Sequence, residues 1–219
     1  MLVLVITDIW GRGSATDRWV LDLQKAGYEV LLLDPYEGQK RSFANETEAY
    51  TAFIECCGHE GYARRVESAV GQIAVQKPNS GLVLLGFSAG ASAAWRVVGS
   101  GEKHGISHLI GFYPGQIRNN LGLSPGCPVT LIFPAAEDHF SVDDTISALR
   151  EKQEVVCFKA EGAHGFLNPL SHNYCASEAQ KYTDVICAEE KILIAFDVRN
   201  AIAELVGSIM SEEERASGS

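Results

Sequence analysis

The sequence predicts an α/β protein with a mostly parallel central sheet and helices on both faces. Six short apolar runs alternate along the chain with longer segments of helical pattern, and buried parallel strands have this continuous apolar character. Each connection is long enough to hold a crossover helix, which favours parallel pairing. The predicted strands lie at residues 2–6, 29–33, 81–85, 108–112, 129–133 and 154–158.

Helices are predicted between these strands and after the last one. They cover residues 15–26, 46–73 with a break at 58–61, 89–98, 142–152 and a final region at 177–210. The segment 113–128 is rich in proline and glycine, so we expect an irregular loop that overhangs the site. Because no change in composition marks a second unit, one domain is predicted over residues 1–210, followed by a flexible tail at 211–219.

Charge and composition exclude several classes of partner. The 28 acidic and 18 basic side chains give a net charge of −10, which disfavours nucleic acid. The apolar start, residues 1–6, is interpreted as a strand rather than a secretion signal, and no apolar run is long enough to span a membrane. The six cysteines are expected to be thiols, without a zinc site, in a cytoplasmic protein.

A candidate nucleophile follows the third predicted strand. The sequence Gly86-Phe87-Ser88-Ala89-Gly90 stands between that strand and a helical segment, which is the context of a nucleophile elbow. Small residues on either side of Ser88 would allow a tight and strained turn there. The pattern predicts Ser88 as the nucleophile of an acyl-transfer reaction.

A serine nucleophile needs a base, and the base needs an acceptor that orients it. His164 follows the sixth strand between glycine and alanine neighbours, and it is preferred to the more distal His172. Asp138, in the loop after the fifth strand, is the predicted acid, with its neighbour Glu137 as the alternative. The sequence therefore predicts a triad of Ser88, His164 and Asp138.

The remaining parts of the site are expected around this triad. The backbone N–H groups of Ala89 and Ile9 are the predicted oxyanion donors. Trp10, Phe87 and Phe166 are expected to line the substrate pocket. Neither a cofactor nor a metal ion is implied, and the oligomeric state is not indicated.

Four ordered patches resemble the dienelactone hydrolase family of the α/β-hydrolase superfamily. They are Asp8-Ile9-Trp10-Gly11, Asp34-Pro35-Tyr36, Gly86-Phe87-Ser88-Ala89-Gly90 and Ala163-His164-Gly165-Phe166. The resemblance implies an α/β-hydrolase fold without a separate cap domain, and an enzyme that hydrolyses esters.

Three positions differ from the family's pattern. Ser88 replaces the cysteine nucleophile of its best-known members, and Asn168 stands where they carry an arginine that binds a substrate carboxylate. Asp8 takes the place of a glutamate that partners the nucleophile, which implies an auxiliary role for Asp8 beside the pocket.

The predicted function is hydrolysis of a small ester or lactone through an acyl-enzyme. Two alternatives stay open: a hydrolase-like binding protein without turnover, and a peptidase or acyltransferase with the same triad.

Overall fold

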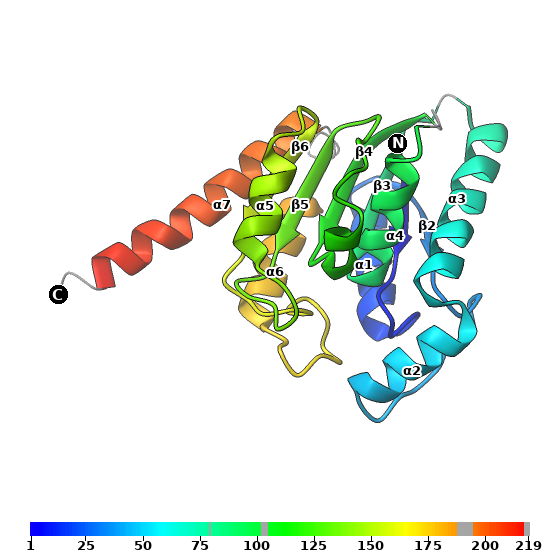
Figure 1. Ribbon diagram of the computed structural model, residues 1–219, viewed down its shortest axis with the longest axis horizontal. Helices are drawn as coiled ribbons and strands as arrows, with labels where there is room; N and C mark the ends of the chain where they lie inside the picture. Colours follow the sequence, from blue (N-terminus) through cyan, green and yellow to red (C-terminus); the bar gives the residue numbers. More distant parts are fainter. Residues whose placement is uncertain (79, 102–104, 188–194, 217–219) are drawn as a thin grey trace.

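The chain forms a six-stranded sheet in which all strands are parallel (Figure 1). The computed structural model describes residues 1–78, 80–101, 105–187 and 195–216. The strand order is β2-β1-β3-β4-β5-β6. The strands are β1 (Leu2–Ile6), β2 (Glu29–Leu33), β3 (Leu82–Phe87), β4 (Ile106–Phe112), β5 (Val129–Phe133) and β6 (Val155–Lys159).

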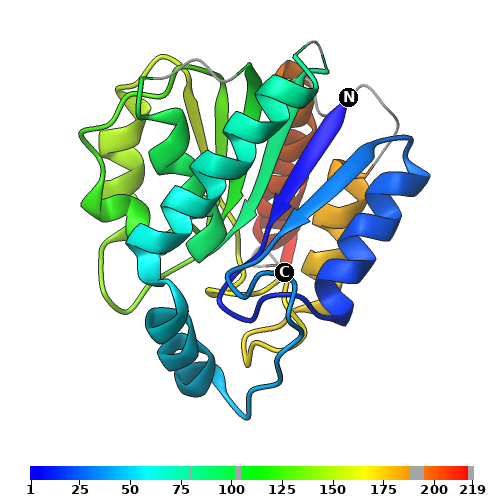
Figure 2. The same cartoon turned by 90° about the vertical axis from the view of Figure 1, so that its right-hand side faces the viewer.

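Helices cover both faces of the sheet (Figure 2). One face packs against α3 (Gly58–Gln76), α4 (Ala89–Val98) and α5 (Val142–Arg150). The other packs against α1 (Ser14–Lys25), α6 (Ala176–Ile186) and the first turns of α7 (Ala195–Ala216). The short helix α2 (Glu46–Cys56) precedes α3, and a 3-10 helix, η1 (Gly115–Asn119), follows β4. The predicted fold class is confirmed.

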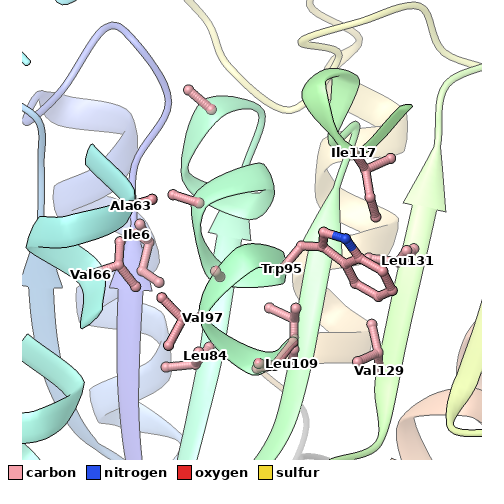
Figure 3. Close-up of a cluster of buried hydrophobic side chains, with 14 of the residues drawn as sticks. Ile6, Ala63, Val66, Leu84, Trp95, Val97, Leu109, Ile117, Val129 and Leu131 are labelled. Atoms are coloured by element: carbon pink, nitrogen blue, oxygen red, sulfur yellow. The ribbon is translucent and has the colours of Figure 1, made fainter. Parts of the chain in front are cut away.

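Two hydrophobic cores follow from the alternation of side chains along the strands. In β1, Leu2, Leu4 and Ile6 contribute to the core on the α4 side, whereas Val3 and Val5 contribute to the core on the α1 side. Figure 3 shows the first core, where the fully buried Trp95 of α4 lies among side chains of β4, β5 and η1. The indole N–H of Trp95 donates to the Asn120 carbonyl at 3.0 Å, so the burial leaves no polar group unpaired on that ring.

The element boundaries differ from the predicted ones at a few points. The predicted helix 46–73 is two helices that meet at Cys57, next to Gly58 with its positive φ of 56°. The final helical region is also two helices, and the residues between them, 188–194, lie outside the described part. Helix α7 continues through residues 211–216, where a tail was expected. The extent of the domain, residues 1–210, stays a prediction.

The topology gathers the site residues at one edge of the sheet. Because all strands are parallel, the loops after β1, β3, β5 and β6 leave from the same edge. After β1 the chain forms β2 on one side of it and then returns to form β3 on its other side, so the order of the strands reverses between β1 and β3. Ligands in open α/β sheets bind at such a switch point. None of the described helices is long and apolar enough to cross a bilayer.

Candidate active site

Ser88 occupies a strained turn between β3 and α4. Its φ of 48° and ψ of −112° lie in a region that side chains disfavour. The turn is held by hydrogen bonds from the Ser88 N–H to the Phe112 carbonyl, 2.9 Å, and from the Ser92 N–H to the Ser88 carbonyl, 3.0 Å. The predicted elbow geometry is present.

The two glycines of the motif are required by close backbone contacts. A Cβ at Gly90 would lie 2.4 Å from the carbonyl oxygens of Ile6 and Thr7, and one at Gly86 would lie 2.6 Å from the Ala91 Cα. Helix α4 therefore approaches the end of β1 more closely than any residue with a side chain would allow. This packing places the start of α4 beside the loop after β1.

His164 lies next to Ser88, although the two residues are far apart in the sequence. Its Nε2 is 2.9 Å from the Ser88 Oγ. The loop that carries His164 is held by the Asn173 side chain, which donates to the His164 carbonyl at 2.9 Å. His172, the alternative base, lies at the rim of the site, where its Nδ1 is 3.6 Å from a carboxylate oxygen of Glu46.

The carboxylate that contacts His164 belongs to Glu137. Its Oε1 is 2.6 Å from the His164 Nδ1, and the Glu137 side chain is only 11% exposed. The expectation that Asp138 makes this contact is wrong, because the Asp138 side chain is exposed on the cleft wall. The Ala135 N–H donates to the Gly162 carbonyl at 2.9 Å, which fixes the loop after β5 against the loop of His164 and turns Glu137 inward.

The two predicted oxyanion donors, the N–H groups of Ile9 and Ala89, belong to residues of the cleft. Ile9 and Ala89 both line the cleft beside Ser88, and within the described residues neither N–H has a hydrogen-bond acceptor. Ala89 is the first residue of α4, where the helix dipole favours negative charge. The Tyr36 hydroxyl donates to the Ile9 carbonyl at 2.6 Å and lies 3.3 Å from the Ala49 carbonyl of α2, so the Ile9 peptide is held in place.

Asp8 lies behind this loop rather than on the cleft surface. Its carboxylate accepts hydrogen bonds from the Trp10 N–H at 3.0 Å and from the Asn168 side chain at 2.6 Å. Burial raises the pKa of Asp8 to about 6, against the opposing effects of Asn168, Trp10 and His164. Asp8 therefore links the loop after β1 to the loop that carries His164.

The raised pKa has a defined effect on stability. The folded protein holds the Asp8 proton more tightly than the unfolded chain, whose carboxyl has a pKa near 3.8. The folded state is therefore favoured by this group below about pH 4, and that contribution is lost as the pH rises toward about 6.

Two of the residues expected in the pocket belong to the core instead. Phe87 is a strand residue that faces the α1 side, where its ring stacks on Phe112 at 5.5 Å between centroids. Phe166 is fully buried against Tyr113 and Tyr182. Trp10 does line the cleft, as predicted.

The cleft above Ser88 has a volume of about 1050 Å³. Part of the segment 113–128, which was expected to be an irregular loop, is the 3-10 helix η1, and Gly115, Gln116 and Arg118 of this helix line the cleft. Further lining residues were not foreseen, because they come from segments without a recognisable motif. They include Phe43, Glu46, Tyr50, His59, Pro169 and Leu170.

Arg118 is the one lysine or arginine among the residues that line this cleft. Its guanidinium donates to the Gly115 carbonyl and lies 5.0 Å from the centre of the Phe140 ring. In the described part of the chain, no group of three or more His, Cys, Asp or Glu side chains could hold a metal ion.

The side chains of Ser88, His164 and Glu137 lie in one line of contacts beside the cleft. A hydroxyl, an imidazole and a nearly buried carboxylate form a continuous hydrogen-bonded chain, close to two N–H groups that have no acceptor among the described residues. This combination can activate a hydroxyl and stabilise an oxyanion.

The chain is similar to a known protein family and to a bacterial relative. The model of the dienelactone hydrolase family matches residues 1–187. The uncharacterized protein YczH of Bacillus subtilis is 31% identical over 177 residues, which cover 78% of this chain and 82% of YczH.

Solved structures of low sequence identity share the fold. The dienelactone hydrolase-like promiscuous phosphotriesterase P91 from metagenomic libraries is 18% identical, with a TM-score of 0.65 over 85% of this chain and 83% of P91. A dienelactone hydrolase from Anabaena variabilis is 17% identical, with a TM-score of 0.58 over 84% of this chain and 83% of that enzyme.

Proposed function

The chain belongs to the dienelactone hydrolase family, and we propose that it is a serine hydrolase that cleaves carboxylic esters or lactones. The observation that carries this proposal is the hydrogen-bonded chain from Ser88 through His164 to Glu137, with distances of 2.9 Å and 2.6 Å. Glu137 takes the role of the acid in place of Asp138. The strained elbow at Ser88 also supports it, because such strain is found at functional sites.

The reaction begins with attack by the Ser88 Oγ on the ester carbonyl. As the new C–O bond forms, the His164 Nε2 takes the hydroxyl proton, and Glu137 stabilises the resulting imidazolium through Nδ1. The carbonyl oxygen becomes an oxyanion, which the N–H groups of Ile9 and Ala89 stabilise.

Collapse of the tetrahedral intermediate breaks the ester bond and leaves an acyl group on Ser88. His164 gives its proton to the departing alkoxide, so that the alcohol leaves neutral. A water molecule then attacks the acyl-enzyme with His164 as the base; the bond between the acyl carbon and the Ser88 Oγ breaks, His164 returns the proton to this oxygen, and the carboxylic acid leaves. Hydrolysis therefore needs one ester and one water and returns Ser88 to its starting state.

The experiment that tests this proposal is labelling with a fluorophosphonate, which reacts with activated serine hydroxyls. We expect the label on Ser88, and we expect Ser88→Ala to lose both the label and the hydrolysis of p-nitrophenyl acetate. Ser147→Ala, at an exposed helix position, is the matched control. A wild-type protein without label on Ser88 would support a hydrolase-like binding protein instead.

We also infer a cytoplasmic location and a small-molecule substrate. None of the six cysteines is paired in a disulfide, which supports a reducing compartment. The excess of acidic side chains argues against a nucleic-acid substrate.

A further inference from the structure

Apolar side chains gather on two walls of the cleft that holds Ser88. We call this group the apolar rim: Trp10, Phe43 and Tyr50 on one wall, Pro169 and Leu170 on the other. The rings of Trp10 and Phe43 meet edge to face, with centroids 6.3 Å apart. Tyr50 is 45% exposed and Leu170 is 56% exposed, so both are large apolar side chains in contact with water. Exposed apolar groups that share a hollow are typical of binding sites.

The two walls face each other across one space. Glu46, at the start of α2, and His172, in the loop between β6 and α6, approach to 3.6 Å. Figures 1 and 2 both show this yellow loop beside the start of α2. The apolar rim therefore bounds a single cavity.

The wall that carries Leu170 is held in place by hydrogen bonds. The Asn168 side chain donates to Asp8 at 2.6 Å and accepts from the Leu170 N–H at 2.9 Å. The Asn168 N–H also donates to the Gly165 carbonyl at 2.9 Å. These contacts fix the backbone on which Leu170 is exposed, which is the preorganisation that a binding surface requires.

The cleft is large and continuous enough for one molecule to reach both Ser88 and the apolar rim. Ser88 and His164 line the same cavity as the apolar rim. Its volume, about 1050 Å³, reaches the upper end of ligand pockets, about 300–1,000 Å³. A molecule that reacts at Ser88 can therefore place part of its structure against the rim.

We propose that the apolar rim binds an extended apolar chain or ring of the ester substrate, with Tyr50 and Leu170 as specificity-determining residues. This inference rests on the proposed hydrolase function and narrows its substrate class. The enzyme then prefers esters with a long apolar group to the small esters that the sequence suggested.

The test is a series of p-nitrophenyl esters from acetate through butyrate to octanoate. Full burial of a methylene contributes about 0.8 kcal/mol, or about fourfold in kcat/KM. Because the rim stays open to water on one side, we expect about twofold per methylene, or roughly 60-fold from acetate to octanoate. A second series, ethyl acetate to octyl acetate followed by acid release, shows whether the apolar group lies on the acyl or the alcohol side.

If the apolar group lies on the acyl side, the variants Leu170→Ser and Tyr50→Ser should each lower the octanoate-to-acetate ratio of kcat/KM by about fivefold. If it lies on the alcohol side, the octyl-to-ethyl ratio should fall instead. Leu21→Ser is the matched control, because Leu21 has the same side chain and is 55% exposed, but lies on α1 away from the cleft. It should leave both ratios unchanged.

Two outcomes would overturn the inference. One is a flat response to chain length in both series. The other is that Leu170→Ser and Tyr50→Ser leave both ratios of kcat/KM unchanged. If light scattering then finds that these variants alter self-association, the rim binds a second copy of the chain instead of the substrate. Loss of the proposed function is a separate result, seen as acetate hydrolysis that survives Ser88→Ala.

Discussion

Glu137→Gln tests the identity of the catalytic acid, because the adjacent Asp138 provides a matched control. The Glu137 carboxylate accepts from the His164 Nδ1 at 2.6 Å and is 11% exposed, so little water screens it. A glutamine of the same shape removes the negative charge. If its NH₂ group faces Nδ1, the imidazole takes the tautomer with its proton on Nε2, which cannot accept the Ser88 proton.

The expected cost follows from this geometry. Loss of the charge and of the correct tautomer should reduce kcat by about 10⁴, or about 5.5 kcal/mol of transition-state stabilisation. Asp138→Asn should change kcat less than about threefold, because the Asp138 side chain is exposed and does not contact His164.

The assay is steady-state hydrolysis of p-nitrophenyl acetate together with the rate of Ser88 labelling by a fluorophosphonate. Both rates should fall in Glu137→Gln and persist in Asp138→Asn. If Asp138→Asn is the more damaging change, the proposed triad is wrong, and the acid is the one that the sequence favoured.

Three further predictions follow from other parts of the molecule. Asp8→Asn should keep kcat within about a hundredfold of wild type. Because only wild type loses the contribution of the Asp8 proton as the pH rises, the free energy of unfolding of Asp8→Asn minus that of wild type, measured in urea, should increase by about 2–3 kcal/mol between about pH 4 and pH 7. Iodoacetamide should modify Cys175 first, because a hydrogen bond with Ser177 lowers the pKa of this partly exposed thiol; hydrolysis should persist when mass spectrometry shows the label. Gly90→Ala should lower the free energy of unfolding by about 3 kcal/mol through overpacking against β1, whereas Gly71→Ala, with open space around its Cα, should raise it by about 1 kcal/mol.

Each of these predictions has an outcome that would refute its reasoning. Labelling of Ser88 in Asp8→Asn as slow as in a His164→Ala control would make Asp8 part of the catalytic machinery. Inactivation in step with the alkylation of one cysteine would put a thiol in the site. Equal stability of the two glycine variants would mean that α4 can move away from β1 without cost.

The sheet and the elbow could be predicted because local patterns determine them. Buried parallel strands require continuous apolar runs, and the turn at Ser88 requires glycines at positions 86 and 90, where a Cβ would meet backbone atoms. The chain order of an α/β-hydrolase then places a histidine after β6, which singled out His164.

The acid and the pocket could not be predicted because they depend on orientation and on contacts between distant segments. Glu137 and Asp138 are neighbours of the same charge, and a backbone bond between the loops after β5 and β6 decides which of them turns inward. Strand β3 continues to Phe87, and the alternation of side chains along it places Phe87 in the core. The predicted strand ended at residue 85, so this position was not recognised as part of the strand. Tyr50 and Leu170 line the same cleft only in the folded chain.

The Tyr36 hydroxyl joins two parts of the molecule with different tasks. It contacts the carbonyl of Ile9, the residue proposed to supply an oxyanion donor, and the carbonyl of Ala49 in α2, the helix that contributes Tyr50 to the apolar rim. One side chain therefore joins α2 to the loop that carries the proposed oxyanion donor, so a substrate bound against Tyr50 would lie on a helix linked to that loop. Binding energy from a remote apolar group would then be used at the reacting bond, so that long esters gain in kcat rather than only in KM.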